Sequence, residues 1–181
     1  GGLIHVNVVG CGIMAAVAGS SAVTCATIGR MSIPELKKRN YDETLSIGSL
    51  AGSGTLGLLI PPSIMLIVYG VLAQVSISRL FIAGVLPGIM IIGIFMSYII
   101  IRAKLNPSLA PKQDVKYTFF EKIKAARNLL PVVGLIFLFL GSVYGGYANP
   151  TEAATIGVIG ALLLAWSSKS LTFKSFVDSL M

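Results

Sequence analysis

The chain has 181 residues and a mass of 19.0 kDa, with 55% hydrophobic residues, 12% charged residues and a formal net charge of +7. A soluble domain carries about 25% charged residues, so this chain has too little polar surface to stay in water. The composition predicts an all-α, polytopic integral membrane protein and excludes disordered, collagen-like and disulfide-stapled chains. No nucleic-acid partner is expected, because the cations fall between long uncharged segments and form no single basic surface.

Five segments contain no charged residue, and they set the expected membrane elements. They are 6–29, 44–78, 80–101, 128–151 and 153–168. A helix needs about 20 apolar residues to cross the hydrocarbon core of a membrane. Segments 80–101 and 128–151 therefore fit one crossing each, and 153–168 fits a short one.

The segment 44–78 is too long for one crossing, and its centre is interrupted. Residues 52–63 read GSGTLGLLIPPS. The pair Pro61 and Pro62 cannot continue a regular helix, because proline lacks the N–H donor and clashes with the preceding turn. We expect two half-helices, at about 44–52 and 63–72, joined by unwound backbone.

The segment 6–29 is also interrupted, because glycine and serine crowd its centre. Half of such a run is too short to span a membrane. A re-entrant helical hairpin with its tip at Gly19, Ser20, Ser21 and Ala22 fits better than a single crossing. Non-helical backbone at membrane depth survives only where protein or water surrounds it, so both interruptions predict a buried or water-lined site.

The lysines and arginines test this layout, because cytoplasmic loops of membrane proteins carry an excess of positive charge. If the broken helix and the later spans each cross once, all basic residues from Lys37 onward except Arg79 fall on one side, which is then the cytoplasm. Arg30 lies near the same side, at the mouth of the hairpin. The charges support the later spans but do not distinguish a hairpin from a crossing at 6–29.

We expect four regions along the chain. Residues 1–32 form the re-entrant hairpin, and 33–105 form the broken transmembrane helix and the transmembrane helix after it. Residues 106–128 form a cytoplasmic basic loop or an interfacial helix, and 129–181 form two transmembrane helices and the start of an amphipathic arm. Apolar residues recur at helical spacing among charges in 112–127 and 171–180, which is typical of helices at the headgroup level.

A helix start is predicted at 149–152, where the sequence reads NPTE. Proline suits the first helical turn, and a threonine and a glutamate there lie near the positive end of the helix dipole. The chain begins with Gly-Gly and without the charged region of a signal peptide, as expected of a fragment.

Other interpretations of the small polar residues stay open. Residues 52–57 fit the G-x-G-x-x-G pattern of dinucleotide sites, but that motif needs a βαβ unit around it. Ser20 or Ser21 with His5 as base would suggest an intramembrane hydrolase. However, no acid follows to orient His5, so no enzyme is expected. Glycine and serine also let helices pack closely without forming any site.

The interpretation that we favour places a cation and an anion at the two interruptions. Discontinuous helices present free carbonyls and helix ends at the bilayer midplane. There, carbonyl and hydroxyl oxygens replace the hydration shell of Na⁺, and helix N-termini face an anion. Asn7 either packs as a hydrogen-bonded residue or lines this pocket. Cys11 and Cys25 are interpreted as small buried hydrophobes, and no cofactor is expected besides Na⁺ as the coupling ion.

Five motifs resemble the large membrane subunit of the tripartite ATP-independent periplasmic (TRAP) transporters, in the family's order over nearly the whole chain. They are HVNVV at 5–9, AGSSA at 18–22, IPPSI at 60–64, LFIAGVLPG at 80–88 and PTEAA at 150–154. The resemblance implies a Na⁺-coupled secondary transporter for an organic anion, of the dicarboxylate or sialic acid type, in the bacterial cell inner membrane. It also implies two partners, a small four-helix membrane subunit and a periplasmic solute-binding protein.

The resemblance further implies an elevator-type motion and two inverted repeats, each with a hairpin and a broken helix. The family's large subunit is more than twice as long as this chain, so about half of the fold and at most one half of the site are expected. With Asn7, the residues that line the ion and substrate site would be Gly19, Ser20, Ser21, Ala22, Ser53, Gly54, Thr55 and Gly57. Of these, Ser20, Ser21, Ser53 and Thr55 are candidate ligands of Na⁺, and Pro61 and Pro62 would hold the helix break open.

Two alternatives to this function remain. A carrier of the divalent-anion sodium symporter type has similar hairpins and needs no binding protein. A channel or a structural membrane subunit would use the interruptions only for packing. No arginine lies in either interruption to clamp a carboxylate, so the sequence leaves the choice of anion open.

Overall fold

The computed structural model describes residues 2–111 and 130–167. Among these residues there are helices and short links but no strand, which confirms the all-α expectation. The chain divides into two compact units, residues 1–116 and 117–181, and each is described by itself. The predicted amphipathic segments 112–127 and 171–180 lie outside the described residues.

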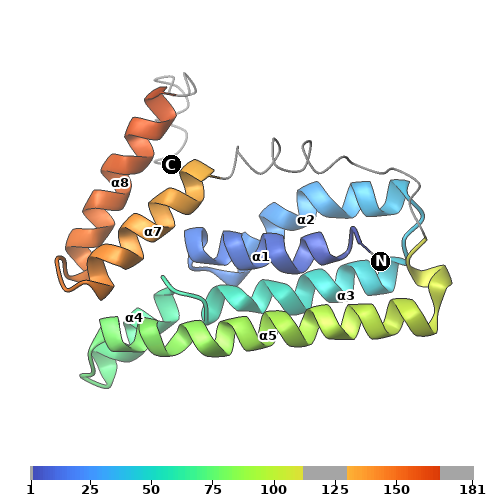
Figure 1. Ribbon diagram of the computed structural model, residues 1–181, viewed down its shortest axis with the longest axis horizontal. Helices are drawn as coiled ribbons and strands as arrows, with labels where there is room; N and C mark the ends of the chain where they lie inside the picture. The colour runs from blue at the N-terminus through green and yellow to red at the C-terminus, as the bar shows by residue number, and fades with distance from the viewer. Residues whose placement is uncertain (1, 112–129, 168–181) are drawn as a thin grey trace. The chain divides into compact units, whose positions relative to one another are not determined.

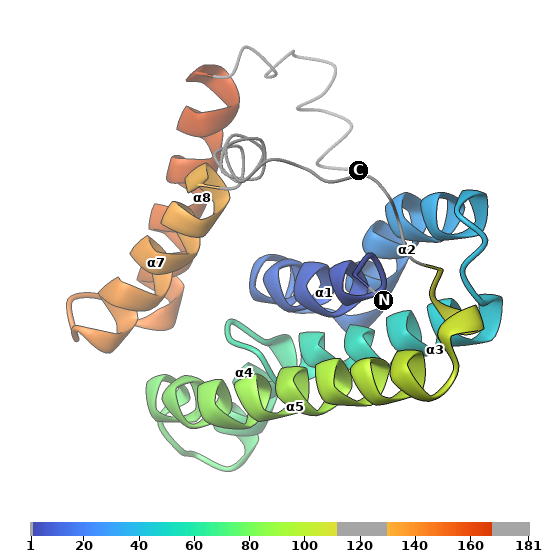
Figure 2. The same ribbon diagram turned by 45° about the vertical axis from the view of Figure 1, so that its right-hand side comes forward.

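The first unit contains five α-helices and two short 3-10 helices among its described residues. They are α1 (His5–Ala18), α2 (Ser21–Lys38), α3 (Glu43–Gly54), η1 (Thr55–Leu58), α4 (Ile64–Leu72), α5 (Ile77–Leu105) and η2 (Pro107–Leu109). The helices α1, α2 and α3 contact one another, and α5 runs along α3 (Figures 1 and 2). Because α1 also touches α5, it has a neighbouring helix on three sides.

The helices α1 and α2 form a pair that is joined at Gly19 and Ser20, where the hairpin tip was predicted. The second helix continues past residue 32, where we expected the first region to end, and includes Pro34 before it stops at Lys38. That the pair enters and leaves the membrane on one side stays a prediction.

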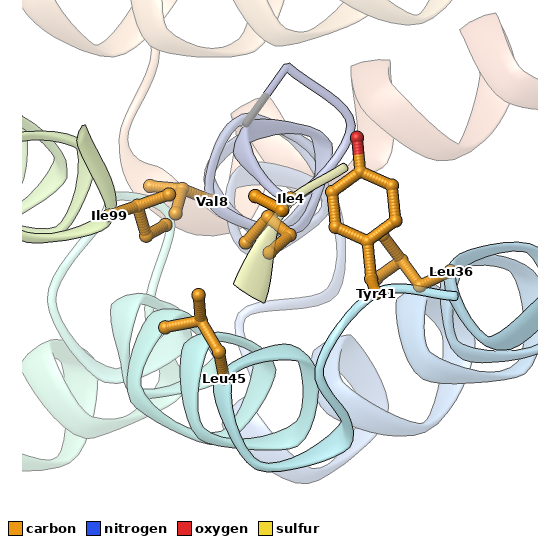
Figure 3. Packing of buried hydrophobic residues seen from close by; sticks show 7 residues of the cluster. Ile4, Val8, Leu36, Tyr41, Leu45 and Ile99 are labelled. Carbon is orange, nitrogen blue, oxygen red and sulfur yellow. The ribbon is translucent and has the colours of Figure 1, made fainter. Parts of the chain in front are cut away.

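A hydrophobic cluster holds the first unit together at the end of the α1–α2 pair that lies away from Gly19. Ile4, just before α1, and Val8 of α1 meet Leu45 of α3 and Ile99 of α5 (Figure 3). Leu36 of α2, Tyr41 of the α2–α3 connection and Ala110 after η2 complete this cluster. The helices are therefore anchored to one another far from the interruptions.

Two helices are long and apolar enough to cross a membrane among the described residues. The helix α5 has 29 residues and a mean hydropathy of 2.3 over its most apolar window, and α8 (Pro150–Ser167) reaches 1.3. At 1.5 Å per residue, α5 is about 43 Å long. Only 17% of the α5 window and 6% of the α8 window is buried inside the protein, so large apolar surfaces face outward, as lipid contact requires. These helices fit the crossings expected at 80–101 and 153–168.

The second unit consists, in its described part, of α7 (Leu130–Tyr144) and α8. The start of α8 is a capping box. The Oδ1 atom of Asn149 accepts hydrogen bonds from the backbone N–H groups of Thr151 and Glu152 at 3.0 and 2.9 Å. In return, the Glu152 carboxylate accepts from the Asn149 N–H at 2.9 Å. The helix start that the NPTE sequence predicts is thus confirmed.

The packing of α5 on the helix break is testable at Gly84. A Cβ atom at this position would lie 2.8 Å from the carbonyl oxygen of Leu59, a backbone atom that has little room to move. We therefore expect Gly84→Ala to lower the melting temperature of the full-length permease in detergent. In the control Gly93→Ala, on the same helix, the new Cβ meets no atom within 4 Å. Alanine gains about 1 kcal/mol of helix propensity there, so the control should melt no lower than the parent. Equal melting temperatures for the two variants would contradict this packing.

Candidate functional site

The first interruption lies between α1 and α2 and depends on Gly19. This glycine has a φ of 58°, in the left-handed region, and its N–H donates to the Ala15 carbonyl at 2.9 Å to close α1. A Cβ atom on Gly19 would also lie 2.9 Å from the backbone oxygen of Pro62. Glycine is therefore needed for two reasons, the backbone conformation and the close approach of a second segment.

The second interruption lies between α3 and α4. The helix α3 tightens into η1, and residues 59–63 then leave helical conformation before α4 begins at Ile64. Pro61 is buried, and the hydroxyl of the fully buried Ser63 donates to the Leu58 carbonyl at 2.7 Å. The two half-helices expected at 44–52 and 63–72 are confirmed, with ends that differ by one or two residues.

The two interruptions are in direct backbone contact. A Cβ atom on Gly57 would lie 2.7 Å from the carbonyl carbon of Ser20 and from the nitrogen of Ser21. The Gly19 carbonyl accepts a hydrogen bond from the Ile64 N–H at 3.4 Å. A Cβ atom on Gly54 would lie 3.7 Å from the Ser21 carbonyl oxygen. We call this meeting point of Gly19–Ser21 with Gly54, Gly57 and Pro62 the junction.

Hydroxyl groups at and near the junction donate hydrogen bonds to backbone carbonyls. Thr24 donates to Ser20 O at 2.7 Å, Ser53 to Ser49 O at 2.6 Å and Thr55 to Gly52 O at 2.6 Å. A hydroxyl that donates its proton keeps its oxygen lone pairs. Ser20 occupies the N-cap position of α2, yet its side chain makes no capping bond. The hydroxyl oxygens of Ser20, Ser53 and Thr55 can therefore coordinate a cation.

The structure does not bring all the predicted site residues to one place. Ser53 is fully buried and faces α1, where its hydroxyl lies 3.5 Å from the Asn7 backbone oxygen. Thr55, two residues later, is exposed, because residues two apart point to different sides of a helix. Ala22 is exposed as well, whereas Gly54 and Gly57 are buried at the junction.

His5 lies far from the Gly19 end of α1, whereas Asn7, although twelve residues before Gly19, contacts Ser53 of α3. His5 is the first residue of this 14-residue helix, which places it about 20 Å from the helix end that carries Gly19. The alternative in which His5 activates Ser20 or Ser21 therefore lacks the required proximity. Within the described residues, no three His, Cys, Asp or Glu side chains gather as metal ligands, so a cation at the junction would be bound by hydroxyl and carbonyl oxygens.

Sequence reasoning missed two hydroxyl residues that border the junction, Thr24 and Ser63. Both are fully buried, and each hydroxyl donates to a carbonyl of an interruption. A signal was present for Thr24, which stands four residues after Ser20 and can bond back along the helix. Ser63 follows the Pro-Pro pair, where an N-cap serine is common.

Interrupted helices that meet through small residues inside a strongly apolar chain are typical of secondary transporters in membranes. Comparison with known proteins gives the particular family. The family described as "Tripartite ATP-independent periplasmic transporter, DctM component" matches residues 1–181, so the chain belongs to this family of transporter permeases. It is thus an integral membrane protein of a transporter family and not one of an enzyme family.

Curated relatives agree with this membership. The chain is 36% identical over 167 residues to the C4-dicarboxylate TRAP transporter large permease protein DctM of Pseudomonas aeruginosa, covering 91% of the chain and 38% of the relative. It is 35% identical over 164 residues to the ectoine TRAP transporter large permease protein TeaC of Halomonas elongata, with the same two coverages. It is 31% identical over 183 residues to the sialic acid TRAP transporter large permease protein SiaM of Vibrio cholerae, covering 99% and 42%. The chain thus spans about two fifths of the length of these relatives.

The contact between the two interruptions can be tested at Gly57. In Gly57→Ala, the new Cβ must push the Ser20–Ser21 peptide away from η1, because both partners are backbone. The thiol of Cys25, which contacts the Leu50 carbonyl at 3.5 Å in the same interface, should then react severalfold faster with a membrane-permeant maleimide. The assay uses the full-length permease with its other cysteines replaced. The control is Gly48→Ala on α3, where a Cβ meets no atom within 4 Å. A parental labelling rate in Gly57→Ala would show that the contact is absent.

Proposed function

We propose that the chain is part of the large permease of a Na⁺-coupled secondary importer for an organic anion. The observation that carries this proposal is the junction. Two interrupted helical elements meet there by backbone contact in a chain of the TRAP permease family. Such interruptions leave carbonyls and helix ends free to bind charged solutes at membrane depth.

Sodium binding is proposed at the oxygens of the junction. Ser20 and Ser21 supply hydroxyls at the start of α2, and the backbone around Gly54 and Gly57 supplies the opposite wall. Ser53 and Thr55 are the further candidate ligands, on two different faces of the broken helix. An ion bound between the two elements would order both of them, because its ligands come from segments more than thirty residues apart in sequence.

The anion is proposed to face the N-termini of α2 and α4, which carry partial positive charge. The names of the relatives mention C4-dicarboxylate, ectoine and sialic acid, all of which contain a carboxylate group. A carboxylate is therefore the shared chemistry that we assign to the substrate. Which carboxylate is carried depends on parts of the permease outside this chain and on the protein that delivers the substrate.

The assembly that we propose contains a small four-helix membrane subunit and a periplasmic solute-binding protein, in the bacterial inner membrane. The basic segments that start at Lys37 and Arg102 would face the cytoplasm. Two inverted repeats and an elevator-type motion complete the proposal, with this chain holding the hairpin and broken helix of the first repeat. A carrier that needs no binding protein, and a channel, are the alternatives that the first experiment distinguishes.

That experiment measures uptake into proteoliposomes that contain the full-length parent permease and its small subunit. A radiolabelled panel of C4-dicarboxylates, ectoine and sialic acid is offered with and without an inward Na⁺ gradient and the cognate binding protein. We expect accumulation of one class of carboxylate that requires both. Accumulation with Na⁺ alone would indicate a carrier of the symporter type without binding protein, and flux that never exceeds equilibrium would indicate a channel.

The candidate ligands can be tested by removing single hydroxyls. Ser53→Ala and Thr55→Ala should raise the Na⁺ concentration for half-maximal uptake, because each removes one candidate oxygen. Thr155→Ala and Ser142→Ala are matched controls, since their hydroxyls also donate to carbonyls of their own helices, at 3.2 and 2.8 Å, but lie in the second unit. Unchanged Na⁺ dependence in both Ser53→Ala and Thr55→Ala would remove these residues from the proposed site.

A further inference from the structure

Asn7 is a buried polar residue whose side chain joins α1 to α3. Its exposed fraction is 0%. The amide nitrogen donates to the Ser46 carbonyl at 3.1 Å and to the Ser49 hydroxyl at 3.0 Å, both on α3. These bonds cross from the first arm of the hairpin to the first half of the broken helix, 39 and 42 residues away in sequence.

In the described part of the chain, two residues of α1 make side-chain hydrogen bonds to α3: Asn7, and Cys11, which bonds to Ser53. The Ser53 hydroxyl also lies 3.5 Å from the Asn7 backbone oxygen, although its proton is directed at the Ser49 carbonyl at 2.6 Å. The remaining contacts between the two helices are packing contacts, such as Val8 in the cluster with Leu45. Packing contacts tolerate sliding of one helix along another better than hydrogen bonds do, because hydrogen bonds depend on both distance and direction.

The junction itself has little to fix its own register. Its contacts are backbone approaches at Gly19 and Gly57, the Cys25 side chain against Gly54, and one long hydrogen bond of 3.4 Å between Ile64 and Gly19. The Ser20–Ser21 peptide begins α2 and is joined to α1 through Gly19 alone, and Gly57 lies in η1, directly after α3. A shift of α1 along α3 would therefore move this peptide off Gly57.

We infer that Asn7 is a positioning residue, which sets the register of α1 on α3 and thereby the geometry of the junction. The inference rests on the proposed function, because it assigns the junction to the coupling ion. Asn7 lies twelve residues before Gly19, or about 18 Å along a helix, so its side chain does not reach an ion held by the Ser20–Ser21 peptide.

Removal of the Asn7 amide leaves its partners satisfied. The Ser49 hydroxyl still donates to the Ser46 carbonyl at 2.9 Å. The Asn7 Oδ1 atom has no hydrogen-bond partner in the described residues, and its removal relieves an unsatisfied buried acceptor. Asn7→Ala should therefore fold, and its effect should appear in ion binding more than in stability.

The test compares Na⁺-dependent uptake by the parent permease complex with that of Asn7→Ala, Ser49→Ala and the double variant. We expect Asn7→Ala to raise the Na⁺ concentration for half-maximal uptake by about fivefold, the lower range of coupling between sites. The maximal rate at saturating Na⁺ should stay near the parental rate. Ser49→Ala removes only a partner of the amide and should give a smaller rise in the same direction. The double variant should match Asn7→Ala, because both changes break the same link.

Val8→Ala is the matched control, since Val8 is the next residue, is equally buried and packs on α3 without a hydrogen bond. It should lower the melting temperature and keep the parental Na⁺ dependence.

A parental Na⁺ dependence in Asn7→Ala would overturn the inference, and so would an equal rise in Val8→Ala. An effect in Asn7→Ala with none in Ser49→Ala would identify Asn7 Oδ1 as a direct ligand and also overturn it. If Asn7→Ala fails to assemble, Ser49→Ala decides alone. If the parent complex shows no Na⁺-dependent uptake, the proposed function fails first.

Discussion

The structure depends on one constraint, that polar backbone groups inside a membrane must find partners within the protein. Continuous helices meet this constraint alone, but an interrupted helix leaves N–H and C=O groups open at the break. In this chain the two interruptions are joined by a hydrogen bond, which the Ile64 N–H donates to the Gly19 carbonyl. Buried hydroxyls of Thr24 and Ser63 cover further carbonyls. Each break therefore meets part of its hydrogen bonding within its own segment and part through the other break.

Glycines make this mutual arrangement sterically possible. Gly57 lets the broken helix touch the Ser20–Ser21 peptide, and Gly84 lets α5 approach the Leu59 carbonyl from another side. A methyl group at either position would stand within 3 Å of backbone atoms, which cannot rotate away as a side chain can. Glycines on open surfaces such as Gly48 and Gly93 carry no such contact, so the composition alone does not reveal which glycines matter.

Local chemistry made the element boundaries predictable, whereas tertiary packing decided the rest. The break at Pro61 and Pro62 follows from the missing N–H of proline, and the start of α8 at Pro150 follows from its capping box. No local rule states which side of α3 turns toward α1, so the opposite placement of Ser53 and Thr55 was not foreseen. The burial of Thr24 and Ser63 was missed for the same reason, because it depends on segments that are distant in sequence.

The linkage between the two proposed ligands follows from this shared construction. The C-terminal end of α1 and the N-terminal end of α2 meet within the few peptide units between Ala18 and Ser21. An ion that holds the Ser20–Ser21 peptide against Gly57 also fixes the start of α2, and thus the N–H groups that would face a carboxylate. Binding free energies are reciprocal, so the anion must strengthen ion binding by the same factor. In this arrangement the proposed coupling needs no path through the protein, because one peptide would contribute to both proposed sites. The register of α1 on α3 would then control both affinities together, which is the role inferred for Asn7.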